Sequence, residues 1–357
     1  MKPTLFATYV IALPLWASAA CESSDELPSH DAESTVELEA GRGESVGGDG
    51  PVAAGAGGGG SAAAGAGEDA AGAADSGSEP FGPGVETFAW GTDDFTVEPG
   101  EEKYLCFAKT LEEDLVASGY TTQGGRKQPF VHHLIFAKVN KPEPEGFAEC
   151  DVAFRNSWET LFISGAGETT LEFPSDAGHQ LKSGTQLLVQ MHLLNSGTER
   201  VTGQVAINLR KSQVESPRPV SSAVFGTAAV ELPPSSESQV VGTCTARRNT
   251  KLIAGFPHMH TLGKSLRFEV GAAEAELKEV FKREPYDFDD QRIENLEVEI
   301  PQGATTRVTC TYENTHAQTI TYGESTTNEM CFFVGFAVDS ERGGGCLEVL
   351  PPLDGLN

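Results

Sequence analysis

Basic residues are scarce in this chain. Its 357 residues include 25 Lys and Arg against 52 Asp and Glu, so the formal net charge is −27. A protein that binds nucleic acid needs a basic face that neutralises phosphates, and no stretch clusters Lys and Arg densely enough to provide one. We therefore expect no nucleic-acid partner.

Long hydrophobic runs are also missing. The apolar run over residues 5–16 contains Pro14 and is too short for a membrane span of about 20 residues. Lys2 precedes this run and small residues follow it, so residues 1–20 are typical of a secretory signal peptide. Cys21 stands at the acceptor position of a bacterial lipoprotein signal. We predict an exported protein of the bacterial cell envelope, anchored to the membrane by a lipid on Cys21; cleavage near Ala20 and secretion is the alternative.

Aromatic residues are absent between residues 22 and 80, where Gly, Ala and acidic residues prevail. Such a segment cannot bury enough apolar area to offset the entropy lost on ordering. We therefore predict a disordered tether over residues 21–80. The remaining residues, 81–357, are numerous enough for two hydrophobic cores.

Short alternating apolar patterns dominate this remainder. They occur at residues 186–194, 203–209, 266–270 and 297–300, between Gly, Pro, Asn and Ser, as in strands joined by turns. The best helical candidate, residues 272–282, has no clear cap. The pattern predicts an all-β chain of two tandem antiparallel β-sandwich domains, jelly-roll-like in kind. A Pro-rich joint near residue 216 divides them into residues 81–216 and 217–357.

Six cysteines lie beyond Cys21. An even number of thiols in an exported chain indicates disulfides, and two fall before the predicted boundary and four after it. We expect three bridges, none between the domains, although spacing leaves the pairing of the last four open. Thiolate metal ligands are the alternative, which the lack of a Cys-x-x-Cys pair disfavours.

Two tight pairs of histidines carry the clearest chemical signal. In a strand, residues i and i+2 point to the same face, so His258 and His260 can present two imidazoles to one metal ion. The alternative is a pair of hydrogen-bonded surface histidines that bind no metal. His132 and His133 are adjacent and project oppositely on a regular strand. Both can bind one ion only if a bulge or strand end turns one ring.

Two further residues have ordinary explanations when taken alone. His192 lies on an apolar strand, where a single histidine is more often a core residue than a ligand. Met330 would ordinarily fill a core. However, a thioether beside imidazoles favours Cu(I).

The order of the motifs resembles that of the copper type II, ascorbate-dependent monooxygenases. The resemblance covers about residues 85–350. It rests on five motifs in order: Tyr104-x-Cys106, His132-His133, Gln190-x-His192, His258-x-His260-x-Leu262-Gly263 and Glu329-Met330-Cys331.

The resemblance implies two coppers per chain. His132, His133 and His192 would bind an electron-transfer copper in the first domain. His258, His260 and Met330 would bind an oxygen-activating copper in the second domain and act as its catalytic residues. The resemblance also implies that Gln190 helps to couple the coppers and that the disulfides are Cys106–Cys150, Cys244–Cys346 and Cys310–Cys331. The other histidines match no ligand position: His30 lies in the tether, and His179 and His316 lie in polar, turn-like sequence.

The resemblance further implies hydroxylation of a C–H bond in a small-molecule substrate, with O2 and an external reductant such as ascorbate. Phe256 and Val334 stand where the peptide-hydroxylating branch of the family has an Arg and a Tyr that bind the substrate carboxylate, so we expect a more apolar substrate. A non-catalytic copper-binding envelope lipoprotein is the second hypothesis. A structural β-sandwich adhesion module, which would take up no copper, is the third.

Overall fold

The protein is described by a computed structural model, in which nearly all regular structure is β-strand. The described residues are 80–122, 130–150, 157–165, 169–340 and 344–348, together with Arg155 and Gly167. The predicted signal peptide and nearly all of the predicted tether, with Cys21 and His30, lie outside them. Within the described part of the chain, no helix has the length and apolar character needed to cross a membrane.

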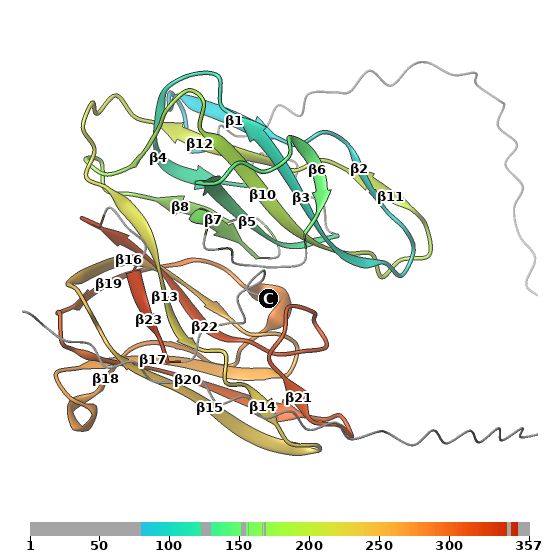
Figure 1. Cartoon of the computed structure of the whole chain (residues 1–357), viewed down its shortest axis with the longest axis vertical. Helices are drawn as coiled ribbons and strands as arrows, with labels where there is room; N and C mark the ends of the chain where they lie inside the picture. The colour runs from blue at the N-terminus through green and yellow to red at the C-terminus, as the bar shows by residue number, and fades with distance from the viewer. Residues whose placement is uncertain are drawn as a thin grey trace, which may run out of the picture. The chain divides into compact units, whose positions relative to one another are not determined.

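The first region of strands runs from residue 87 to residue 211 and forms two five-stranded sheets and one pair (Figure 1). One sheet has the order β1-β12-β4-β8, with β9 also paired to β4; the other has the order β6-β3-β10-β5-β7; and β11 pairs with β2. Their bounds are β1 (Thr87–Gly91), β2 (Phe95–Val97), β3 (Glu102–Thr110), β4 (Leu115–Thr121), β5 (Val131–Val139), β6 (Gly146–Glu149), β7 (Trp158–Ser164), β8 (Thr170–Glu172), β9 (His179–Leu181), β10 (Gln186–Leu194), β11 (Val201–Gly203) and β12 (Ala206–Lys211).

The second region runs from residue 220 to residue 347 and shares no described strand with the first. Its sheets have the orders β19-β16-β22-β13-β23 and β15-β20-β17-β18, beside the pair β14-β21. Their bounds are β13 (Val220–Thr227), β14 (Glu231–Leu232), β15 (Ser236–Thr245), β16 (Thr250–His258), β17 (Gly263–Gly271), β18 (Lys278–Arg283), β19 (Glu294–Ile300), β20 (Thr305–Asn314), β21 (Ile320–Thr321), β22 (Cys331–Val338) and β23 (Gly344–Leu347), with the 3-10 helices η1 (Glu274–Glu276) and η2 (Phe288–Asp290).

The all-β prediction is confirmed, and the strand at residues 186–194 has the predicted bounds. This strand, β10, lies between β3 and β5 in the middle of its sheet. Its residues are buried on both faces, apart from the last, because a central strand of a covered sheet meets apolar side chains on each side.

The helical candidate at residues 272–282 is wrong. Only the short η1 is helical there, and its N-cap Ala273 makes no capping hydrogen bond. The next residues form β18, whose Phe281 is buried and lies 5.0 Å from the Phe333 ring. Pairing with β17 and burial of this ring therefore outweigh the local helical pattern.

Hydrophobic packing joins the two regions. One core cluster contains Phe136 and Leu161 of the first region together with Phe256 and Val334 of the second, and the described residues of both regions belong to one compact unit. The division into two domains at residues 216 and 217 therefore stays a prediction.

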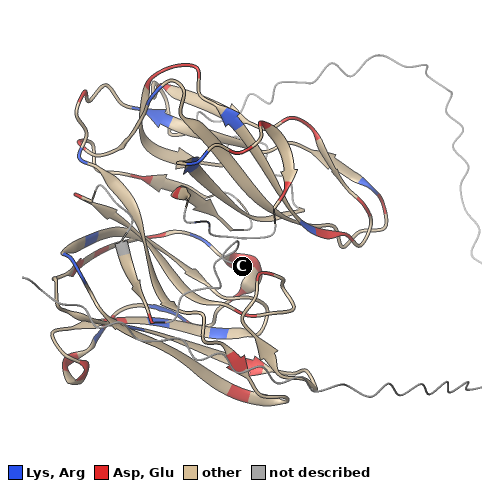
Figure 2. Cartoon of the chain, viewed as in Figure 1, with Lys and Arg blue, Asp and Glu red and all other residues tan. Residues whose placement is uncertain are grey.

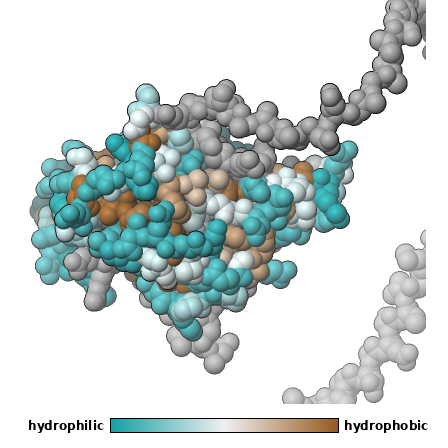
Figure 3. All heavy atoms as spheres, turned by 90° about the horizontal axis from the view of Figure 1, so that it is seen from above, coloured by the Kyte–Doolittle hydropathy of each residue, from teal (hydrophilic) through white to brown (hydrophobic). Residues whose placement is uncertain are grey.

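Charged residues are scattered over both regions in the view of Figure 2, and hydrophobic atoms form only separate patches on the face in Figure 3.

Candidate metal centre

The first candidate cluster consists of His132, His133 and His192, from the neighbouring strands β5 and β10. His192 pairs with His133, but the next residue of β10, Leu193, pairs with Val131. His132 is therefore the extra residue of a β-bulge. This is the irregularity that two adjacent histidines need before both rings can face one point.

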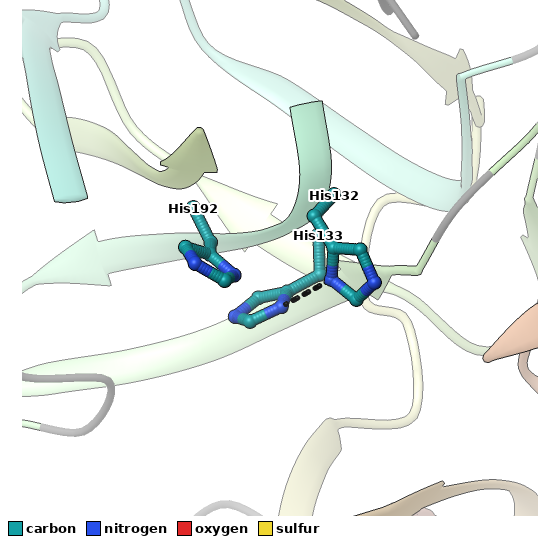
Figure 4. A group of neighbouring side chains, drawn as sticks. All are labelled: His132, His133 and His192. Carbon is teal, nitrogen blue, oxygen red and sulfur yellow. Dashed lines mark hydrogen bonds between the residues drawn. The ribbon is translucent and has the colours of Figure 1, made fainter. Parts of the chain in front are cut away.

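The three rings meet in the protein interior (Figure 4). One possible ligand atom from each histidine lies within 4.8 Å of the others, and the Nδ1 atoms of His132 and His133 are 3.4 Å apart. Burial lowers the pKa of His133 well below its usual range, helped by the neighbouring histidines. Burial also lowers the pKa of His192. Neutral imidazoles of this kind are the form that binds a metal.

Two residues of β3 hold the ring of His192. The Nε2 atom of His192 lies 2.9 Å from a carboxylate oxygen of Glu102, and the Tyr104 ring stacks on the imidazole at 4.6 Å. Because Glu102 accepts the Nε2 proton, Nδ1 remains as the ligand atom. This Nδ1 is buried without a hydrogen-bond partner, which fits a place for a metal ion.

The second candidate cluster contains His258, His260 and Met330. The prediction that both histidines lie on one strand is wrong in part, because β16 ends at His258 and His260 lies in the turn after it. The rings nevertheless lie 5.2 Å apart. Sequence alone could not place the end of the strand, since the same i, i+2 spacing continues into the turn.

Hydrogen bonds orient both of these histidines. The Nδ1 atom of His258 lies 2.8 Å from Oε1 of Gln291, and the Nδ1 atom of His260 lies 3.0 Å from the carbonyl oxygen of Asn328. Both acceptors require a proton on Nδ1, which leaves each Nε2 as the ligand atom. Burial lowers the pKa of His258 to about 4 and that of His260 to about 3, so both rings are neutral near pH 7.

Glu329 holds the backbone of the turn after β16. Its carboxylate is fully buried and accepts hydrogen bonds from the backbone N–H groups of His260 and Leu262, at 2.8 and 2.7 Å. Burial raises the pKa of Glu329 to about 7, although these backbone bonds oppose the shift. The next residue is Met330, whose side chain is buried and whose carbonyl accepts a hydrogen bond from Tyr312.

The two clusters lie close together. The rings of His133 and His258 are 5.6 Å apart. Phe288 of η2 stacks on His132 at 4.0 Å and lies 6.2 Å from His260, so one aromatic ring contacts both clusters. The first cluster offers three imidazoles, and the second offers two imidazoles and has the buried Met330 directly after Glu329, which bonds to the backbone of His260. Imidazoles and a thioether are donor types that suit copper.

The structure also describes Gln190 and the two histidines outside the clusters, His179 and His316. Gln190 is buried on β10, two residues before His192 and thus on the same face of the strand. His316 is exposed and lies outside the strands, in agreement with its turn-like sequence. The expectation of a turn is wrong for His179, which is buried on β9 and lies 2.6 Å from the Tyr120 hydroxyl.

Sequence reasoning missed the residues that support the histidines. Glu102, Gln291 and Asn328 are 90, 33 and 68 positions from their histidine partners. No spacing rule links such distant residues. Local signals exist for Glu329 and Tyr104, which stand inside the Glu-Met-Cys and Tyr-x-Cys motifs.

Three disulfides join Cys106 to Cys150, Cys244 to Cys346 and Cys310 to Cys331. These are the pairs that the family resemblance implied. Cys106 pairs with Gln190 across β3 and β10, and Cys331 directly follows Met330. A bridge therefore lies beside each cluster.

The comparisons with known proteins agree with this donor chemistry. Residues 222–340 match the family model for the C-terminal domain of the copper type II ascorbate-dependent monooxygenases. The chain is also 26% identical over 243 residues to a human protein provisionally named DBH-like monooxygenase protein 2. Both matches support the assignment of the chain to this monooxygenase family. The alignment covers 61% of the chain and 48% of the human protein, so the chain spans about half the length of that relative.

Solved structures add nothing to this assignment. The major capsid protein P2 of bacteriophage PM2 gives a TM-score of 0.35 at 10% identity, over 72% of this chain and all of that one. An allantoicase gives a TM-score of 0.20 at 11% identity, over 63% of this chain and 79% of the other. Both TM-scores are too low to support a conclusion about a copper monooxygenase.

Proposed function

We propose that this member of the copper monooxygenase family hydroxylates a C–H bond of a small organic substrate, using O2 and an external one-electron reductant such as ascorbate. The observation that carries the proposal is the burial of two histidine clusters that suit copper, 5.6 Å apart between the rings of His133 and His258. A single copper-binding surface site would not need two such clusters.

The balance of the reaction requires two electrons and two protons. One oxygen atom of O2 becomes the hydroxyl group of the product, and the other becomes water. Two coppers, when bound, would supply the electron storage and the O2 activation that this balance requires. We propose that His132, His133 and His192 hold the storage copper and that His258, His260 and Met330 hold the copper at which O2 reacts.

The chain's own residues would keep each imidazole neutral and correctly turned. Burial keeps the rings unprotonated, and Glu102, Gln291 and the Asn328 carbonyl select which nitrogen faces the metal. Gln190 shares the strand and face of His192, which supports a role in coupling the two clusters.

We also propose that the substrate lacks a carboxylate that must be bound near the second cluster. Phe256 and Val334 pair with each other across β16 and β22. Both are buried, at 2% and 1% exposure, and neither side chain can pair with a carboxylate. An apolar or aromatic small molecule is therefore the substrate class to test first.

The experiment that tests the function measures copper content and O2 consumption on the same preparation. Two coppers per chain, with O2 uptake that requires both reductant and substrate, would support the enzyme. His258→Ala and Met330→Ala should abolish O2 uptake, whereas His316→Ala, a change at an exposed histidine outside both clusters, should not.

Two results would contradict the proposal. Copper uptake without turnover, across a panel of apolar and aromatic substrates, would favour the non-catalytic copper-binding lipoprotein. Full activity in both His258→Ala and Met330→Ala would show that O2 reacts elsewhere.

Labelling of Cys21 by a fatty acid, measured by mass spectrometry, tests the proposed membrane anchor separately.

A further inference from the structure

One carboxylate contacts both halves of the candidate metal centre. Glu102, at the start of β3, lies 2.9 Å from Nε2 of His192 in the first cluster. The same carboxylate accepts a hydrogen bond at 2.9 Å from the hydroxyl group of Thr326. The backbone N–H of Thr326 also donates to it, at 3.3 Å.

Thr326 belongs to the segment that leads into the second cluster. Two residues later, the carbonyl of Asn328 accepts the hydrogen bond from His260, and Met330 follows two residues after that. A continuous series of hydrogen bonds and short backbone steps therefore runs from His192 through Glu102 to His260.

A second contact from the same strand supports this connection. Tyr104 lies two residues after Glu102 and thus on the same face of β3. Its ring stacks on His192, and its hydroxyl donates to the carbonyl oxygen of Glu324 at 2.6 Å. Two side chains of β3 therefore hold one imidazole and one loop at the same time.

We propose that Glu102 is a positioning residue of the copper centre. It holds the Nε2 proton of His192 so that Nδ1 faces the metal, and it ties this histidine to the loop that carries Asn328 and Met330. A carboxylate behind a metal-bound imidazole also strengthens the imidazole as a donor. This role rests on the proposed function, because it requires that His192 binds copper.

The test compares Glu102→Ala, Glu102→Gln and Thr326→Val in the full chain loaded with copper. Glu101→Gln is the matched control, since Glu101 is the preceding residue and pairs with Lys103 rather than with a histidine. A His258→Ala background isolates the first cluster, whose Cu(II) affinity, electron paramagnetic resonance spectrum and reduction potential are then measured.

We expect Glu102→Ala to weaken copper binding at the first cluster by about 10- to 100-fold. Glu102→Gln keeps the shape and an acceptor oxygen but removes the charge, so the potential should rise while the affinity changes less. Thr326→Val should leave the affinity of the first cluster within about threefold and slow turnover in the protein that retains His258, because it removes the hydroxyl bond to Glu102 and keeps the weaker backbone bond.

Three results would overturn the proposal. If both Glu102 variants have the affinity, spectrum and potential of Glu101→Gln, Glu102 does not position His192. If Thr326→Val turns over as fast as the parent protein, the hydrogen bond from the Thr326 hydroxyl group to Glu102 has no role in coupling the clusters. If the parent protein binds no copper, the proposed function itself is wrong. If the Glu102 variants bind copper, are active and have unchanged spectra, only the role of Glu102 is wrong.

Discussion

In the first region, three histidines lie inside one sheet, where β5 and β10 pair directly and a bulge turns His132. In the second region, His258 ends a strand and His260 lies in a turn, held by the distant residues Gln291, Asn328 and Glu329. Backbone pairing therefore positions most of the first cluster, and side chains from separate loops position the second. A cluster held by loops can adjust its geometry at lower cost, which would suit the proposed role of the second cluster as the site where O2 reacts.

The largest difference between the clusters should appear when one ligand is removed from each. His192→Ala should leave one copper per chain and lower turnover by more than about a hundredfold, since loss of an outer partner alone costs about 10- to 100-fold. His258→Ala should also leave one copper but with a different Cu(II) spectrum. Copper analysis and spectroscopy of both variants check this, and identical spectra would mean that the clusters are not two separate sites.

The disulfides beside the two clusters allow a comparison of stability. The Cys106–Cys150 bridge spans 44 residues and the Cys310–Cys331 bridge spans 21. Loop-closure entropy predicts losses of about 4 and about 3 kcal/mol in the free energy of unfolding when each is removed. Urea unfolding of the paired Cys→Ser variants measures both values. Beyond stability, we expect loss of Cys310–Cys331 to weaken copper binding at the second cluster only, because Met330 precedes Cys331.

Glu329 tests how far the second cluster depends on a single buried side chain. Glu329→Ala leaves the backbone N–H groups of His260 and Leu262 without their acceptor, which should lower the free energy of unfolding by about 2 to 3 kcal/mol. Glu329→Gln keeps one acceptor oxygen and should lose less. If urea unfolding gives equal stabilities for Glu329→Ala and the parent protein, backbone pairing alone holds this turn.

The last expected effect, which is small near neutral pH, is a pH dependence in the first region. Burial lowers the pKa of His179 to about 3, from a usual value near 6.5. A lowered pKa in the folded state means that the unfolded chain binds the proton more tightly, so stability is complete above pH 6.5 and falls as the pH drops towards 3. The expected slope is about 1.4 kcal/mol per pH unit in that window.

His179→Asn isolates this contribution from that of the other buried histidines. Asn keeps an oxygen that can accept from Tyr120 but cannot be protonated in this range. Denaturation of the metal-free proteins at pH 7 and pH 5 should show a smaller loss for the variant than for the parent. An equal loss in both proteins would mean that His179 does not contribute to acid sensitivity.

Several features of the fold could be predicted because they depend on near neighbours in the sequence. The apolar run at residues 186–194 is long enough to cross a covered sheet, and it forms β10 with those bounds. The need for a bulge at His132 follows from the alternation of side chains in a strand. By contrast, residues 272–282 have a helical composition, but β18, which begins at Lys278, pairs with β17 and buries Phe281.

The sequence by itself indicated the candidate donor set and the resemblance to a family, through the types and order of its histidines, Met330 and cysteines. Only the tertiary structure decided which nitrogen of each imidazole is hydrogen-bonded and which residues lie behind it. Glu102, Gln291 and Asn328 act across 90, 33 and 68 residues of chain. Hydrogen bonds over such separations depend on how sheets and loops pack, a property that local periodicity does not encode.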